Sequence, residues 1–355
     1  MAQHQSAWVR AGSIAAASVA TSLVVGIASG IASGIAYSAL AIDHALPLPP
    51  AISAERRSLR AGRSGALSYY ADDTVSGRPL LLIHSVNAAA SAYEMRPLFE
   101  RYRGQRPTYA IDLPGFGFSE RSDRAYSPAL YTAAVRELLS EMTSDREAPD
   151  VVALSLGCEF AARAALQEPE RVRSLALISP TGLSAQTQRN RSERAGESGS
   201  GASIYQLFRF PLWSQAFYDA LASRWSIRYF LQKSFVGAPD SGLLAYAYAT
   251  SHQPGARFAP LRFVSGQLFS PDIRETVYEQ LPMPVVALYD QDAFVRFDTL
   301  THVVARNPHW RAMRIAPSKG LPQFERLDAT IQALGSFWQD VEAKSAEISA
   351  PLPPS

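Results

Sequence analysis

The chain alternates between short, nearly continuous apolar runs and longer segments whose apolar residues recur every three or four positions. The short runs are typical of buried parallel strands, and the longer segments are typical of helices that cover them. We predict six such strands: Pro79–Ile83, Thr108–Ile111, Val151–Leu154, Leu175–Ile178, Val285–Tyr289 and Ala312–Ile315. This alternation predicts an α/β fold with a mostly parallel central β-sheet flanked by helices.

Turn and cap signals place further elements around this sheet. Residues 58–72, with glycines near the middle, predict an antiparallel hairpin before the first parallel strand. Ser127 followed by Pro128 predicts a helix start, because serine caps a helix and proline fits its first position. The apolar spacing over 324–341 predicts a closing helix, and we expect the proline-rich tail, 342–355, to fray.

The alternation stops between residues 183 and 281. A polar stretch over 186–201 is followed by many aromatic residues: Phe208, Phe210, Trp213, Phe217, Tyr218, Trp225, Tyr229 and Phe230. We interpret 183–281 as a helical lid inserted over the strand ends; alternatively, these rings pack the insertion's own core. The core domain is then 52–182 together with 282–341.

The N-terminal segment, 1–45, has a different composition from the rest. Residues 13–42 contain no charged side chain, and about 20 apolar residues suffice to cross a bilayer. We predict a single-pass membrane anchor; a cleaved signal peptide, and hence a secreted or periplasmic protein, is the alternative. Gly26, Gly30 and Gly34 repeat on one helix face, which predicts a homodimer through close helix pairing.

The charge, the cysteine count and the histidine spacing argue against nucleic-acid binding, an intrachain disulfide and a metal site. The 355 residues carry a formal net charge of +2, which gives no electrostatic case for nucleic acid. The single cysteine, Cys158, excludes an intrachain disulfide. Six scattered histidines show no paired metal-ligand spacing, so we expect neither a metal nor another cofactor.

A candidate nucleophile lies directly after the third predicted parallel strand. The segment Ala153–Gly157 has the pattern small-x-Ser-x-small of a nucleophile elbow, with alanine in place of the usual first glycine. Small neighbours are needed because Ser155 sits in a strained turn that directs its hydroxyl into a cleft. The backbone amide of Leu156, at the start of a helix, would then face a developing oxyanion.

Three more segments, in the expected order, resemble the α/β-hydrolase family. Ile83–Asn87 resembles the His-Gly-x oxyanion loop, with Ser85 in place of glycine. Residues 112–119, Asp-Leu-Pro-Gly-Phe-Gly-Phe-Ser, are similar to the D-x-P-G-x-G-x-S segment, and Pro284–Phe294 resembles the loop that delivers the catalytic acid.

The resemblance, which covers about 80–341, implies the α/β-hydrolase fold with a lid insertion. It also implies that Ser155 is the nucleophile, that Asp292 is the acid, and that the amides of Val86 and Leu156 form the oxyanion hole. One part of the family pattern is missing, however. The loop after the last strand should carry the catalytic histidine, and here it reads Ser-Lys-Gly-Leu-Pro-Gln-Phe-Glu over 318–325.

Neither Gly320 nor Gln323 in this loop can accept the serine's proton. Candidates for a substitute base or for a pocket residue are His84, His252, Glu159 and Gln323. In the family, the histidine at position 84 normally hydrogen-bonds backbone.

Two functions from different classes follow from the sequence. The first is a membrane-anchored serine hydrolase that acts on an ester-like or other small apolar substrate. The second is an inactive hydrolase-fold protein that binds a ligand or partner at the membrane, where Gln323 keeps hydrogen bonding but removes basicity. Hydrolase-fold chemistry without acyl transfer is a third, less supported alternative, since a fold does not determine a function.

Overall fold

The computed structural model describes residues 29–143, 146–185 and 200–349. These residues contain an eight-stranded sheet with the order β1-β2-β4-β3-β5-β6-β7-β8. The strands are β1 (Glu55–Ala61), β2 (Gly65–Asp72), β3 (Leu80–Ile83), β4 (Thr108–Asp112), β5 (Asp150–Leu154), β6 (Ser174–Ile178), β7 (Val285–Gln291) and β8 (Trp310–Lys319). Strand β2 pairs antiparallel with both β1 and β4, and the pairs from β4 to β8 are parallel.

All six predicted parallel strands and the predicted hairpin are confirmed. Strands β3, β5 and β6 are buried along their whole length, because helices cover both faces of the sheet. Alternate residues of one strand therefore enter different cores: Leu81 and Ile83 pack in one cluster, and Leu80 and Leu82 pack in the other.

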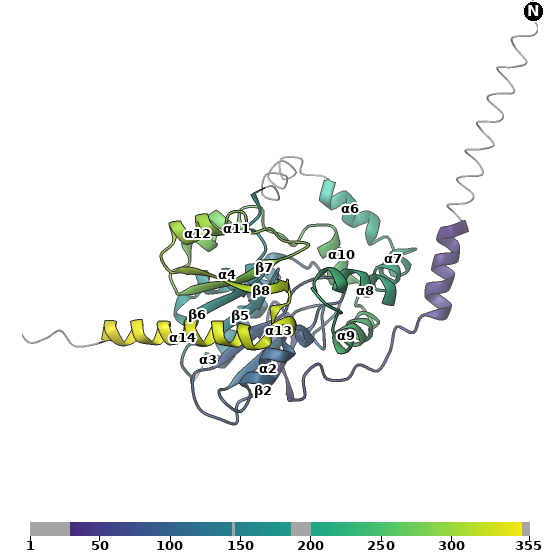
Figure 1. Cartoon of the computed structure of the whole chain (residues 1–355). Coiled ribbons are helices and arrows are strands. Elements are labelled where there is room, and N and C mark those ends of the chain that lie inside the picture. The colour runs from purple at the N-terminus through teal and green to yellow at the C-terminus, as the bar shows by residue number, and fades with distance from the viewer. Residues whose placement is uncertain (1–28, 144–145, 186–199, 350–355) are drawn as a thin grey trace, which may run out of the picture.

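Two helical layers cover the sheet, as Figure 1 shows. One contains α3 (Pro128–Thr143), α4 (Gly157–Gln167) and α12 (Leu300–Arg306), and the other contains α2 (Arg96–Tyr102) and α14 (Leu327–Ser349). The predicted cap of α3 is confirmed, because the Leu130 amide donates to the Ser127 hydroxyl at 3.2 Å. The prediction of a fraying tail from residue 342 is wrong as far as Ser349, since α14 continues to that residue.

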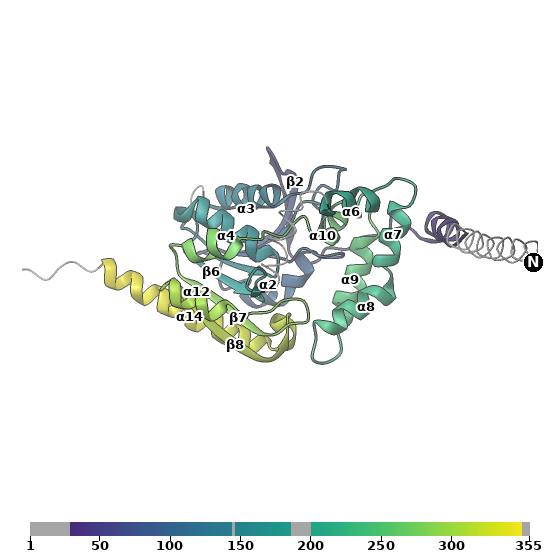
Figure 2. The ribbon, with the colours of Figure 1, turned by 90° about the horizontal axis from the view of Figure 1, so that it is seen from above.

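The insertion between β6 and β7 is helical, as predicted. It contains α6 (Ser200–Phe208), α7 (Ser214–Leu221), α8 (Arg224–Lys233), α9 (Ser241–Ser251), α10 (Phe258–Val264) and α11 (Ile273–Thr276). The short helix η3 (Tyr278–Gln280) also belongs to this insertion, and the short helices elsewhere are η1 (Ala92–Met95), η2 (Pro169–Arg171) and α13 (Pro322–Glu325). Figure 2 shows α7, α8 and α9 at the end of the molecule farthest from α14. Most of the polar stretch predicted over 186–201 lies outside the described residues.

A helix over residues 29–41 lies beside this insertion (Figures 1 and 2). The Ser38 hydroxyl donates to the Asp219 carboxylate of α7 at 2.5 Å, and the His44 ring contacts the same carboxylate at 2.9 Å. In the part of the chain described here, no helix is both long and apolar enough to span a membrane. Residues 13–28 of the charge-free run, including Gly26, lie outside that part.

Candidate active site

Ser155 occupies a strained turn between β5 and α4. Its φ of 51° lies in the left-handed region, which a residue with a side chain rarely adopts. A hydrogen bond to the neighbouring strand fixes this turn, since the Ser155 amide donates to the Ile178 carbonyl of β6 at 2.8 Å. The side chain remains partly exposed in an otherwise buried segment. This is the geometry that the elbow pattern predicts for a nucleophile, and backbone strain of this kind is common at functional sites.

The loop after β3 packs directly against this elbow. A Cβ atom added to Gly157 would lie 2.3 Å from the backbone oxygen of His84, so only glycine allows the two segments to approach so closely. The contact brings the predicted oxyanion loop to the first turn of α4. Neither the Val86 amide nor the Leu156 amide has a hydrogen-bond acceptor among the described residues. Two buried N–H groups without acceptors are suited to an oxyanion.

His84 is held as a neutral ring by backbone groups on both sides. The Leu113 amide donates to Nε2 at 2.9 Å, so Nδ1 must carry the proton that it shares with the Ser85 carbonyl. Burial lowers the pKa of this ring to about 4. Because both nitrogens are engaged, His84 has no free lone pair for the serine's proton. It hydrogen-bonds backbone groups, which is the role that the resemblance to the family implies.

Glu94 in η1 is a site residue that sequence reasoning did not identify. One oxygen of its carboxylate accepts the Ser85 amide and the other accepts the Asn87 side chain, both at 2.9 Å. These partners flank Val86 on either side, so the carboxylate fixes the backbone around one predicted oxyanion donor. Burial raises the pKa of Glu94. In sequence it resembles an ordinary surface glutamate, and only the fold reveals its position.

Asp292 lies after β7, in the loop predicted to deliver the acid. One carboxylate oxygen accepts the amides of Phe294 and Val295 at 2.7 and 3.1 Å, and burial raises the pKa of the group. The other oxygen faces Gly320: a Cβ atom added there would lie 2.8 Å from it. The loop after the last strand therefore meets the acid at Gly320, which has a φ of +87°.

Gln323 points elsewhere. Its side chain is fully buried, and its amide nitrogen donates to the Glu94 carbonyl at 3.1 Å. Its amide oxygen has no hydrogen-bond partner within the described chain. Gln323 is thus a neighbour of the segment that supports the oxyanion loop, whereas Gly320 is the neighbour of Asp292.

The other candidates for a base are also engaged in contacts of their own. His252 follows the last residue of α9, where its Nδ1 lies 2.7 Å from the Tyr248 carbonyl and its ring stacks with that of His44. Glu159 is fully buried and accepts from the Thr181 hydroxyl at 2.6 Å and from the Ser270 amide at 3.0 Å. Over the described ranges, no hydrogen bond joins the Ser155 hydroxyl to any histidine.

Cys158 is a packing residue at the start of α4. It is fully buried, its thiol donates to the Ala153 carbonyl at 3.2 Å, and burial raises its pKa well above the ordinary value. A thiol that stays protonated is a poor nucleophile.

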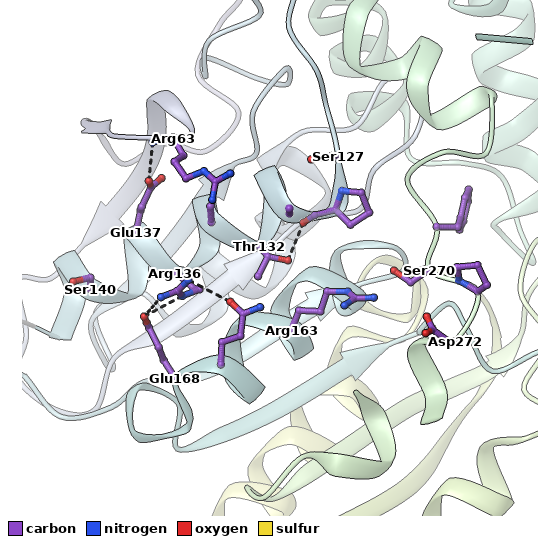
Figure 3. Close-up of a pocket in the computed structure, with 16 residues that line it drawn as sticks. Arg63, Ser127, Thr132, Arg136, Glu137, Ser140, Arg163, Glu168, Ser270 and Asp272 are labelled. Atoms are coloured by element: carbon purple, nitrogen blue, oxygen red, sulfur yellow. Dashed lines mark hydrogen bonds and ion pairs between the residues drawn. The ribbon is translucent and has the colours of Figure 1, made fainter. Parts of the chain in front are cut away.

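A surface depression of about 750 Å³ lies beside α3 and α4 and does not include Ser155 (Figure 3). Its lining mixes both signs of charge: Arg136 is paired with Glu168, and the Arg63 amide donates to Glu137. Because Ser155 does not line it, the depression is separate from the candidate nucleophile.

Comparisons of sequence match the chain to a family of hydrolases. A family model described as "Alpha/beta hydrolase family" matches residues 80–334. Over 114 residues the chain is 32% identical to a 2-hydroxymuconate semialdehyde hydrolase of Pseudomonas sp. (strain CF600), covering 32% of this chain and 40% of that protein. Over 123 residues it is 28% identical to a 2-hydroxy-6-oxo-2,4-heptadienoate hydrolase of Pseudomonas putida, covering 34% and 44%. The chain thus spans less than half the length of these curated relatives.

Solved structures show the same fold at lower identity. A membrane phospholipase A described as a bacterial virulence factor superposes with a TM-score of 0.63 at 20% identity, covering 91% of this chain and 98% of that one. A serine hydrolase involved in carbazole degradation superposes with a TM-score of 0.62 at 16% identity, covering 80% and 98%.

Proposed function

Because the chain belongs to the alpha/beta hydrolase family, we propose that it hydrolyses a small apolar, ester-like substrate with Ser155 as the nucleophile. The observation that carries this proposal is the elbow: Ser155 has a φ of 51°, and the oxyanion loop packs against Gly157 beneath it. A protein that had lost all use for the hydroxyl would have no need to keep this strain, which costs about 1–3 kcal/mol per residue.

The proposed reaction is acyl transfer through the serine. The Ser155 oxygen bonds to the substrate carbonyl carbon, its proton leaves to solvent, and the amides of Val86 and Leu156 hold the carbonyl oxygen as it gains charge. The bond from the carbonyl carbon to the alcohol oxygen then breaks, and the alkoxide takes a proton from solvent and leaves as the alcohol. Water hydrolyses the acyl-serine, which releases the carboxylic acid and restores the Ser155 hydroxyl. Asp292 is the acid of the family pattern, but here it faces Gly320 instead of an imidazole.

A site without the histidine should be slow and should depend on pH in a distinct way. Removal of a triad member leaves about 10³- to 10⁴-fold acceleration from the oxyanion hole and binding. If hydroxide removes the serine's proton, kcat/KM should rise about tenfold per pH unit through neutrality. A histidine base would instead give a plateau above its own pKa.

The test compares the full chain with its Ser155→Ala variant on a short-to-medium series of esters, and then on 2-hydroxymuconate semialdehyde. We expect slow ester turnover that the variant lacks, and covalent labelling of Ser155 by a fluorophosphonate. Equal turnover by both proteins, without labelling, would refute the nucleophile assignment. It would favour the second function, binding of a ligand or partner without turnover, which the replacement of the base by Gly320 and Gln323 supports.

We also propose that the N-terminal segment anchors the protein to a membrane and pairs with a second copy. The charge-free run over 13–42 supports the anchor. Gly30 and Gly34 support the pairing, because no other atom lies within 4 Å of a Cβ placed at either residue, which leaves that helix face open.

A further inference from the structure

The lid exposes an unusual group of large apolar side chains at the end of the molecule beside the N-terminal helix. We define the lid face as Phe210, Leu212, Trp225, Tyr229 and Phe230, which are each more than two-fifths exposed. Trp225 is 76% exposed and Leu212 is 62% exposed. A soluble surface rarely leaves such a cluster uncovered unless it contacts a partner.

The aromatic members of the face on α8 form a continuous row. The rings of Trp225 and Tyr229 stack with centroids 5.6 Å apart, and Phe230 follows at 5.3 Å. Phe230 in turn contacts Phe294, whose ring centroid is 6.3 Å away and which is 58% exposed. Phe294 belongs to the loop of Asp292, so the row leads from the lid to the site.

Positive charge borders this row on α8, which has no acidic residue of its own. Arg224 and Arg228 lie four residues apart on α8, one position before Trp225 and Tyr229, and all four side chains are exposed. Lys233 lies over the Tyr229 ring at 4.4 Å. From residue 200 to 239 the one acidic residue is Asp219, which is buried. Exposed aromatic residues beside arginine and lysine are typical of helices that lie at the surface of an anionic bilayer.

The charge-free N-terminal segment contacts the lid through α7. The helix over 29–41 exposes Ile31, Tyr37 and Leu40, and its Ser38 hydroxyl is bonded to Asp219 of α7. Figures 1 and 2 both show this helix at the same end of the molecule as α7 and α8. A segment that enters a membrane would therefore bring the lid to the bilayer surface.

From these observations we propose that the lid face lies on the surface of an anionic lipid bilayer, with Trp225 at the level of the head groups. The basic side chains of α8 contact lipid phosphates, and the aromatic row gives apolar substrates a route from the bilayer toward the Asp292 loop. The proposal rests on the membrane attachment proposed above and extends it from the N-terminal segment to the lid.

The test is bromolipid quenching of tryptophan fluorescence in the full chain, reconstituted in phosphatidylcholine vesicles with or without phosphatidylglycerol. Trp225→Phe keeps an aromatic ring, so the fold should persist, and it should lower the quenched fraction of the emission. Trp338→Phe is the matched control, because Trp338 lies on α14 and packs against Tyr102 and Arg106. Its removal should raise the quenched fraction.

Charge reversal at Arg228 and Lys233 should reduce the extra quenching that phosphatidylglycerol produces. If the full chain floats with the vesicles but Trp225→Phe does not lower the quenched fraction, the lid proposal alone is refuted. Failure to float would refute the membrane attachment as well. If Trp225→Ser dissociated a dimer without changing the quenching, the face would be covered by a second copy, and the lipid proposal would be wrong.

Discussion

Replacement of Gly157 by alanine tests the contact between the elbow and the oxyanion loop. The added Cβ would lie 2.3 Å from the His84 carbonyl oxygen, whereas ordinary contacts begin at 3.4 Å. The two segments must therefore separate by about 1 Å. The His84 ring is bonded on both sides to backbone, so the shift should pass into the loop that contains Val86.

The expected magnitude follows from this displacement. Insertion of a methyl group into a close-packed contact costs about 1–3 kcal/mol of unfolding free energy. A catalytic group displaced by about 1 Å costs about 10²-fold in rate. Gly335→Ala is the matched control, since Gly335 lies in α14 with no other atom within 4 Å of a Cβ placed on it. There the same change should stabilise the protein by about 0.5–1 kcal/mol, because alanine favours a helix.

The assay is denaturant unfolding of both variants together with the rate at which a fluorophosphonate labels Ser155. We expect Gly157→Ala to lower both stability and labelling, and Gly335→Ala to leave labelling unchanged. Equal stability and equal labelling in the Gly157→Ala variant would show that the loop does not contact the elbow as described. Labelling does not require full turnover, so the test holds even if hydrolysis is slow.

Three further predictions concern Glu94 beside the oxyanion loop, the pH dependence of stability that His84 gives, and the N-terminal anchor. Glu94→Gln should lower kcat about 10- to 100-fold with little change in KM, because charge-assisted bonds to the oxyanion loop are lost, whereas Glu100→Gln, at the surface of α2, should leave both constants unchanged. Burial lowers the pKa of His84 from 6.5 to about 4 on folding, so its contribution to stability is present above pH 6.5 and is lost as the pH falls toward 4. Between pH 7 and pH 5 the free energy of unfolding should therefore fall by about 2 kcal/mol less in His84→Asn than in the wild type. Equal decreases in the two proteins would contradict a neutral His84 ring. Gly30→Leu should weaken a detergent-solubilised dimer in sedimentation, and an unchanged mass would exclude pairing through this helix face.

The sheet was predictable because buried parallel strands have a strong local signal. Each strand covered by helices on both faces must be apolar throughout, and the six apolar runs match the observed strands to within a few residues at either end. The elbow was predictable for a similar reason, since a tight turn under Ser155 restricts its neighbours to small residues. At Gly157 even the Cβ atom of an alanine would lie 2.3 Å from the His84 carbonyl oxygen.

The contacts of the buried carboxylates Glu94 and Glu159 were not predictable in the same way. Glu94 and Glu159 are single carboxylates on helices, which the sequence alone does not distinguish from solvated ones. Their burial depends on segments far along the chain: Glu159 accepts from Thr181 and Ser270, and Glu94 supports Asn87 and contacts Gln323 through its carbonyl. The exposure of the lid aromatics is equally a property of packing, because an aromatic helix in sequence suggests a core.

The missing base is the point at which the structure changes the interpretation of the sequence. Gln323 keeps a hydrogen-bonding side chain and is therefore the natural candidate to replace a histidine, yet it contacts the Glu94 carbonyl and not the acid. Gly320 contacts the acid. Its positive φ, together with the 2.8 Å that would separate an added Cβ atom from the Asp292 carboxylate, disfavours any side chain at this position. An imidazole at residue 320 would require both a different backbone and a displaced carboxylate. The absence of a side chain at residue 320 is therefore coupled to the position of Asp292, which accepts the amides of Phe294 and Val295.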